Sequence, residues 1–321
     1  MMYSQLSNDI QYTDSIWRQS LTITIVPAYR VVAKFARQYR TLAYEESVNS
    51  LERDVREYVR SLLSQLHPSL VDLGERSVIT QMGDPIVDDL VTSLRLLDKD
   101  SPKSIAEKAF LKCSEVLPES SLDANILLFP GDGSSRVLVN QMRGVLGFSL
   151  SAQLMLVFLW PTDNWKDWLK YTVTHEYVHL LRNLRFPRAI SSGRLVFMNT
   201  QEPETLLDAL VVEGIADTFA SNLFPKLKPQ WSEPLSPKLL ESLWHVVHRR
   251  LHVSDTLEIR RILFGDNDRI PPWTGYSIGY QIISAFLKNN PGACLGDLVS
   301  LPAKDILSSS GYPIHYERQQ K

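Results

Sequence analysis

The first 120 residues carry apolar positions at the spacing of amphipathic helices. The clearest stripe runs in steps of three and four through Val48, Leu51, Val55, Val59, Leu62 and Leu66. Such steps place the apolar side chains on one helix face. A second helix is predicted over 84–97, and a third begins at Ser101-Pro102, a capping residue followed by proline. We therefore predict a helical N-terminal region over residues 1–120.

After residue 120 the pattern becomes that of strands. A short apolar segment, 125–129, precedes the loop 130–135 with the sequence PGDGSS. From 146 to 154 the apolar residues fall on even positions, which is typical of a half-buried strand, whereas 154–160 is apolar throughout, as in an inner strand. The uncharged run 144–162 is long enough for a membrane helix, but its period of two indicates strands instead.

Helical spacing returns in the remainder of the chain. Helices are predicted at about 164–185, 203–223 and 273–288, and Ser236-Pro237 and Ser254 each open another. A loop of about fifteen residues separates the first two helices, and loops of that length often carry function. The mixture of strands and flanking helices predicts an α+β fold, with a second region over 121–321.

Composition narrows the possible partners and the location. Lys and Arg number 34 and Asp and Glu number 36 among 321 residues, so the net charge is −2. A nearly neutral chain has no bulk electrostatic attraction to nucleic acid or to acidic membranes. The first twenty residues lack the apolar core of a signal peptide, so we predict a cytoplasmic protein without nucleic-acid or membrane partners. Cys113 and Cys294 are too few for a disulfide framework and are predicted to be buried thiols.

The sequence His175-Glu176-Tyr177-Val178-His179 carries the candidate chemistry. Residues at i and i+4 share a helix face, so two imidazoles can bind one Zn²⁺ while the glutamate between them reaches a metal-bound water. The alternative is two ordinary histidines on a packed helix. The position of the motif, in a helix that directly follows a sheet strand, favours the metal site.

A third ligand is expected downstream. Glu213 lies 34 residues after His179, in the middle of an otherwise strongly apolar helix, where a carboxylate is costly unless it is paired or binds metal. Asp217, one turn further on the same face, can accept the free ring N–H of a zinc-bound histidine. Gly214 and Ala216 are small enough for two helices to approach closely. The alternative for Glu213 is a partly exposed helix carboxylate.

These residues resemble a known group of enzymes. H-E-x-x-H followed by E-G-x-A-D is similar to the gluzincin metallopeptidases, in which the third ligand is a glutamate on a second helix. More closely, the stretches 147–161, 175–217 and 272–287 resemble the bacterial zinc-dependent protease family of the YjaZ type. Val178 stands where that family usually has an extra histidine, at a position that points away from the metal face.

The resemblance implies a zincin-like fold with one Zn²⁺ per chain. A small sheet with an antiparallel edge would pack on the H-E-x-x-H helix, and a helical part would follow at the C-terminus. In such folds an extended substrate adds to the edge of the sheet as a further strand. We place this substrate-binding edge at Val145, Leu146, Gly147, Phe148, Ser149 and Leu150.

The predicted reaction is zinc-dependent hydrolysis of a peptide or protein substrate. Glu176 would take a proton from zinc-activated water and pass it to the leaving amine. Tyr276 and Tyr280, in the sequence G-Y-S-I-G-Y, are candidates for stabilising the oxyanion, although both could be core tyrosines with an ordinary hydrogen bond. A non-peptide amide substrate and a catalytically idle zinc-fold protein that acts through protein contacts are the alternatives. The intact Glu176 favours catalysis because it has little structural use.

Other polar residues are assigned structural roles. His245, His248 and His252 share a helix flank away from the apolar face, and we expect them to face solvent rather than bind a second metal. Arg182, one turn beyond His179, is expected to make a surface salt bridge.

Overall fold

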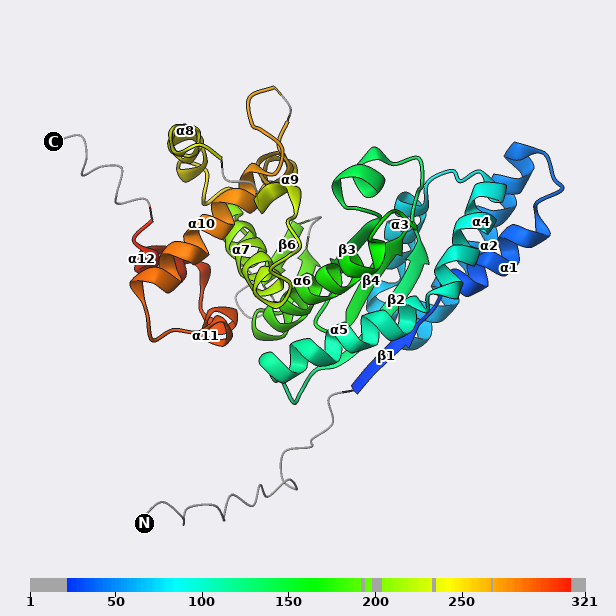
Figure 1. Ribbon diagram of the computed structural model, residues 1–321, viewed down its shortest axis with the longest axis horizontal. Coiled ribbons are helices and arrows are strands. Elements are labelled where there is room, and N and C mark those ends of the chain that lie inside the picture. The colour runs from blue at the N-terminus through cyan, green and yellow to red at the C-terminus, as the bar shows by residue number, and fades with distance from the viewer. Residues whose placement is uncertain (1–21, 192–193, 198–203, 233–234, 267, 313–321) are drawn as a thin grey trace, which may run out of the picture.

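A four-stranded mixed sheet lies at the centre of the molecule, with helices packed around it (Figure 1). The computed structural model describes residues 22–191, 194–197, 204–232, 235–266 and 268–312. In spatial order the strands are β1 (Thr22–Val26), β2 (Asp123–Pro130), β4 (Leu154–Leu159) and β3 (Val145–Ser149). β1, β2 and β4 are parallel, and β3 is antiparallel to β4. The predicted α+β class is confirmed.

The predicted edge strand is also confirmed. β3 pairs with β4 from Val145 opposite Leu159 to Ser149 opposite Met155, and it has no second neighbour among the described strands. Leu150 lies just after β3, and its N–H still bonds to the carbonyl of Leu154. Every residue of β4 is buried, as its continuous apolar sequence indicates.

One strand of the N-terminal region was not expected. We predicted a mostly helical region before residue 120 and no strand in it, but β1 pairs in parallel with β2, from Thr22 opposite Asp123 to Val26 opposite Leu127. Its sequence, TITIV, consists entirely of β-branched residues, which favour a pleated strand. The division of the chain at residue 120 stays a prediction, and β1 ties the two sides of that boundary together by backbone hydrogen bonds.

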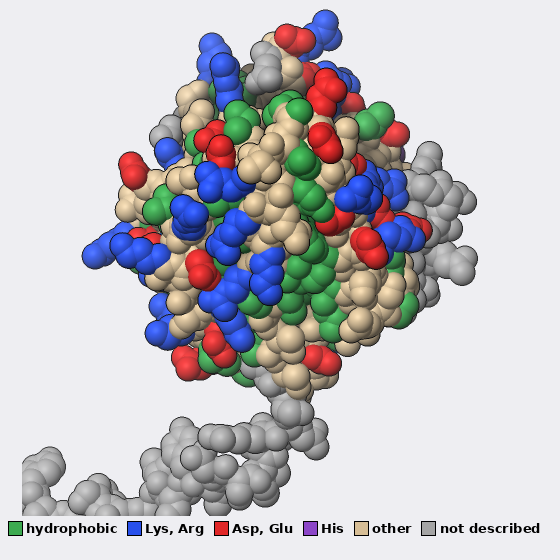
Figure 2. Space-filling model, turned by 90° about the vertical axis from the view of Figure 1, so that its right-hand side faces the viewer, with side chains coloured by type: hydrophobic (Ala, Val, Ile, Leu, Met, Phe, Trp, Pro, Cys, Tyr) green, Lys and Arg blue, Asp and Glu red, His purple; other side chains and the backbone are tan. Residues whose placement is uncertain are grey.

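The described part of this region also contains five α-helices. They are α1 (Tyr29–Gln38), α2 (Tyr44–Leu66), α3 (Val71–Met82), α4 (Val87–Lys99) and α5 (Pro102–Val116). The predicted stripe on α2 is buried at Val48, Leu51, Val55 and Val59. Ser101 does not cap α5 through its side chain, because it has a left-handed φ of 52°, whereas Pro102 does occupy the first turn. Figure 2 views the side where α1, α2 and α4 lie, with charged side chains around a strip of hydrophobic ones.

The second half supplies the helices that carry the candidate site residues. They are α6 (Trp165–Arg185), α7 (Leu206–Leu223) and α10 (Thr274–Asn289). A Cβ atom on Gly214 of α7 would lie 2.3 Å from the carbonyl oxygen of Gly279 on α10. Gly214 therefore does allow a close helix approach, but the closest partner is α10. The remaining helices are α8 (Pro237–His248), α9 (Thr256–Phe264), α11 (Leu295–Ser300) and α12 (Ala303–Ser310).

Several local expectations are corrected. Asp255, not Ser254, caps α9 by accepting the N–H of Glu258. The predicted loop between α6 and α7 contains an antiparallel pair of strands, β5 (Arg188–Ser191) and β6 (Arg194–Phe197). Cys113 is a buried thiol, as expected, but Cys294 is exposed because it lies at the start of α11.

The environment of Arg182 also differs from the prediction. We expected a surface salt bridge, but the side chain is buried and donates to the carbonyl oxygens of Leu298, Val299 and Leu301 at 3.3, 3.1 and 2.7 Å. These carbonyls lie in the last turn of α11 and just after it, where a helix leaves acceptors without internal partners. Arg182 thus fastens α11 to α6.

None of the helices among the described residues is both long enough and apolar enough to cross a membrane.

Candidate metal centre

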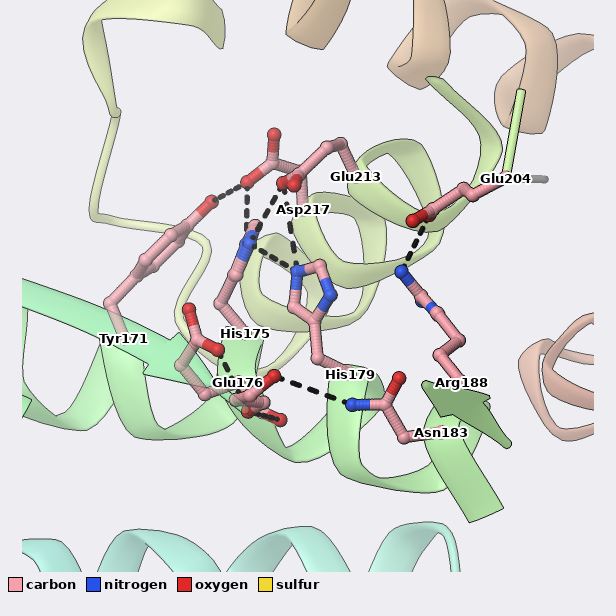
Figure 3. A network of polar contacts seen from close by, with 10 residues as sticks. Tyr171, His175, Glu176, His179, Asn183, Arg188, Glu204, Glu213 and Asp217 are labelled. Atoms are coloured by element: carbon pink, nitrogen blue, oxygen red, sulfur yellow. Dashed lines mark hydrogen bonds and ion pairs between the residues drawn. The ribbon is translucent and has the colours of Figure 1, made fainter. Parts of the chain in front are cut away.

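The central turns of α6 hold the three residues of the H-E-x-x-H motif (Figure 3). His175 and Glu176 are buried and His179 is partly buried. One ligand atom from each of the three lies within 4.8 Å of the other two. The i, i+4 spacing therefore does bring the two imidazoles to one face of α6, ring centroids 4.9 Å apart.

α7 adds a carboxylate to this pair. Glu213 Oε2 lies 3.1 Å from His175 Nε2 and 3.6 Å from His179 Nε2, and the two Nε2 atoms lie 3.1 Å apart. With zinc–ligand distances of about 2.0–2.1 Å, two ligand atoms at corners of a tetrahedron are separated by about 3.3 Å. The three atoms therefore form a triangle of the size that tetrahedral zinc coordination requires.

The hydrogen bonding of His175 indicates what the triangle can hold. Its Nδ1 lies 3.0 Å from Asp217 Oδ1, so Nδ1–H donates to the carboxylate and leaves a lone pair on Nε2. That lone pair faces the oxygen of Glu213 and the Nε2 of His179. Such an arrangement is repulsive unless a proton or a metal cation lies among the three atoms. The residues therefore fit a cation with nitrogen and oxygen ligands.

The electrostatics agree with a cation site. Burial alone would lower the pKa of His175, but its hydrogen bonds to Asp217 and Glu213 outweigh burial and raise the pKa well above its ordinary value. Burial would raise the pKa of Glu213, but His179 and His175 outweigh it and hold the pKa far below its usual range. The surrounding side chains thus keep Glu213 ionised and favour positive charge between them.

Asp217 has further partners, which the sequence did not single out. The phenol of Tyr171 donates towards Asp217 Oδ1 at 3.4 Å and lies 3.3 Å from Ser221 Oγ. Tyr171 precedes His175 by one turn of α6, so its position on the same face was a usable signal. The indole of Trp231 lies near Asp217, but Trp231 Nε1 and Asp217 Oδ2 are both buried without a hydrogen-bond partner among the described residues. Burial raises the pKa of Asp217, and His175 offsets part of this rise.

The edge strand packs directly on Glu176. A Cβ atom on Gly147 would lie 2.5 Å from Glu176 Cγ, so only glycine lets β3 come this close to α6. Ser149 Oγ lies 2.8 Å from Glu176 Oε2. The amide of Asn183 donates to the carbonyl of Ser149 at 3.4 Å and ties the end of β3 to α6. We had placed Gly147 and Ser149 on the substrate edge, but their contact with Glu176 was not visible in the sequence.

The two candidate tyrosines differ in position. The ring of Tyr276 stacks on that of His175, with centroids 6.5 Å apart and planes 21° apart. Burial, together with the nearby carboxylates of Glu213, Asp217 and Glu176, raises the pKa of Tyr276 well above its ordinary value, so the phenol keeps its proton. Tyr280, one turn further along α10, is partly buried and lies close enough to Tyr171 to interact with it electrostatically. Of the two tyrosines, Tyr276 is the one whose ring stacks on a histidine of the motif.

The second histidine group lies elsewhere. His245, His248 and His252 are all exposed, as we expected. Among the described residues, no potential metal-binding group of His, Cys, Asp and Glu side chains is found away from the H-E-x-x-H motif.

Comparisons with known proteins identify the family of the chain. Residues 103–308 match a family model described as "Predicted Zn-dependent protease (DUF2268)". The chain is also 25% identical over 235 residues to "Uncharacterized protein YjfC" of Bacillus subtilis (strain 168). The aligned region covers 68% of this chain and 73% of that protein. No solved structure matches the chain significantly. Because the family model spans well over half of the chain, including His175 to Tyr276, the protein belongs to this family of predicted Zn-dependent proteases, which confirms the resemblance to a zinc-protease family.

Proposed function

We propose that the protein is a zinc-dependent peptidase whose metal is held by His175, His179 and Glu213. The observation that carries this proposal is the triangle of Nε2, Nε2 and Oε2 atoms at 3.1, 3.1 and 3.6 Å. A closed structural zinc site has four protein ligands, whereas a catalytic site has three and an open position. The three-atom set supports the catalytic type.

Each side chain around the triangle has a separate role in the proposed peptide-bond hydrolysis. A bound zinc ion would act as a Lewis acid on the scissile carbonyl and acidify a water molecule. Glu176, held by Ser149, accepts a proton from the attacking water and delivers it to the leaving amine. Asp217 fixes the ring orientation of His175. Tyr276 retains its phenol proton and donates it in a hydrogen bond to the developing oxyanion.

The substrate in this proposal is an extended peptide that pairs with β3. That strand is at the edge of its sheet, with β4 on one side only, and unpaired edge groups are a template for a further strand. Because Gly147 contacts Glu176 directly, a peptide that lines up with β3 passes close to the proposed base. The cytoplasmic location and the lack of nucleic-acid and membrane partners stay predictions.

The metal ligands can be tested by zinc analysis of purified variants. We expect about one zinc ion per chain for the parent protein and for His245→Ala, an exposed histidine outside the centre. His175→Ala and Glu213→Ala should fall well below that stoichiometry, with circular dichroism showing that each variant is folded. Parent-like zinc content in both variants would show that this ligand set is wrong.

A further inference from the structure

A second concave site lies apart from the metal centre, beside α8 and α9 at the opposite end of the molecule from α1 and α2 (Figure 1). The cleft has a volume of about 680 Å³, within the range of small-molecule sites. Its lining includes four arginines, Arg249, Arg250, Arg261 and Arg269, above the apolar side chains of Leu243 and Ile270. None of the described residues lining it is acidic. The cleft is therefore both basic and partly apolar.

Two of the four arginines are held in place by carboxylates behind the lining. Arg250 Nε lies 3.2 Å from Glu258 Oε1, and Arg261 Nη1 lies 3.2 Å from Glu258 Oε2. Arg261 Nη2 also lies 2.6 Å from Asp266 Oδ2. Asp266 Oδ1 accepts the backbone N–H groups of Asp268, Arg269 and Ile270, which orders the loop after α9. These contacts fix the guanidinium groups before any ligand arrives.

The other two arginines have no such partners. Arg249 and Arg269 are exposed, and neither makes an ion pair with any part of the chain that the structure describes. Glu258 and Asp266 thus balance the charges of Arg250 and Arg261, and the described residues leave two positive charges of the lining uncompensated. A dianionic ligand would neutralise them.

We propose that this cleft binds a small molecule that carries a phosphate monoester group. Such a group has a charge of roughly −1.5 to −2 at pH 7 and three acceptor oxygens. A guanidinium group donates two parallel N–H bonds to a pair of oxygens. A phosphate has three free oxygens and can therefore bind several arginines, whereas a carboxylate has two oxygens and pairs with one guanidinium in this way. Leu243 and Ile270, both buried side chains of the lining, would contact the apolar part of the ligand.

The proposal is tested by calorimetric titration of the full chain with phenyl phosphate, whose ring supplies the apolar part. We expect saturable binding to one site. Arg249→Ala/Arg269→Ala should weaken it by about tenfold or more. Arg260→Ala is the matched control, because Arg260 is an exposed arginine of α9 outside the cleft, and it should bind like the parent protein. Benzenesulfonate, a monoanion with the same ring, should bind at least about tenfold more weakly.

Four results would overturn the proposal. They are the absence of saturable binding, equal binding by the double variant, an equal loss in Arg260→Ala, and equal affinity for benzenesulfonate. Tight binding of a phosphopeptide without binding of phenyl phosphate would likewise replace this ligand class by another. Because the substituted arginines are exposed, each variant should have the melting temperature of the parent protein. A matching melting temperature shows that the variant is still folded. The measurement does not depend on zinc or on peptidase activity, so its outcome is independent of the proposed function.

Discussion

Ser149 and Glu176 join the edge of the sheet to the proposed catalytic base. The Ser149 hydroxyl lies 2.8 Å from Glu176 Oε2 and 3.0 Å from the backbone oxygen of the same residue. One side chain of β3 thus contacts both the carboxylate and the helix that carries it. The strand that would align a peptide and the carboxylate that would act on it therefore move as one unit.

Replacing Ser149 tests this connection. Ser149→Ala removes the hydroxyl without adding volume, so Glu176 loses the contact that orients its carboxylate. We expect kcat to fall by about tenfold, with zinc content unchanged. Steady-state kinetics on a cleaved peptide, with metal analysis of the same sample, provides the check. An unchanged kcat would mean that Ser149 does not position the base.

A methyl group at Gly147 should disturb the same contact by crowding. Its Cβ would lie 2.5 Å from Glu176 Cγ and 2.7 Å from Thr172 Cγ2. We expect Gly147→Ala to lower the free energy of unfolding by about 1–3 kcal/mol and kcat/KM by about tenfold or more. Gly292→Ala is the control, because a Cβ there meets nothing within 4 Å. Urea unfolding gives the free energy of unfolding of both variants, and steady-state kinetics gives their kcat/KM. Equal values for Gly147→Ala and Gly292→Ala would contradict the close contact between Gly147 and Glu176.

Asp217 should govern zinc affinity through His175. Asp217→Asn removes the negative charge that accepts the Nδ1–H of His175, so the ring is held less firmly and Nε2 becomes a weaker donor to metal. We expect the Kd for zinc to rise by about 10–100-fold in competition with a chelator. Ser221→Ala, which removes only a contact to Tyr171, should leave the Kd unchanged. If Asp217→Asn bound zinc like the parent, Asp217 would have no part in the centre.

Replacing Arg182 should affect the stability of the protein rather than its reaction. Burial lowers its pKa to about 10, yet its Nη1 serves three carbonyl oxygens at the end of α11. Arg182→Met keeps an apolar stem but removes the donor to the carbonyls of Val299 and Leu301, so we expect a loss of about 3 kcal/mol in the free energy of unfolding. Arg260→Met, at an exposed site, should change it by less than about 0.5 kcal/mol. Chemical denaturation of both variants measures the difference.

The residues of the candidate site were the most predictable part of the chain. Helix geometry alone relates His175 to His179 and Glu213 to Asp217, because each pair is one turn apart. A carboxylate in the apolar sequence of α7 was a second signal, since burial of Glu213 needs a compensating cation. The alternation at 145–150 likewise identified β3 before its partner strand was known.

Contacts between distant segments could not be predicted in this way. The β-branched sequence of β1 favours a strand, but its parallel pairing with β2, about a hundred residues later, has no local signal. The carbonyls that Arg182 binds lie 116 to 119 residues downstream, so its burial left no local pattern. The contact of Gly147 with Glu176 depends on the packing of β3 against α6 and has no periodic signature either.

The central claim is that zinc and Glu176 together hydrolyse peptide bonds, and a peptide-library digest with Glu176→Gln as the control tests it most directly. The substitution keeps the size of the side chain and leaves His175, His179 and Glu213 untouched, while it removes the proton acceptor. We predict about one zinc ion per chain in both proteins, with peptide cleavage by the parent and none detectable for the variant. Equal cleavage by both zinc-loaded proteins, or no cleavage by the zinc-loaded parent across the library, would contradict the proposed function.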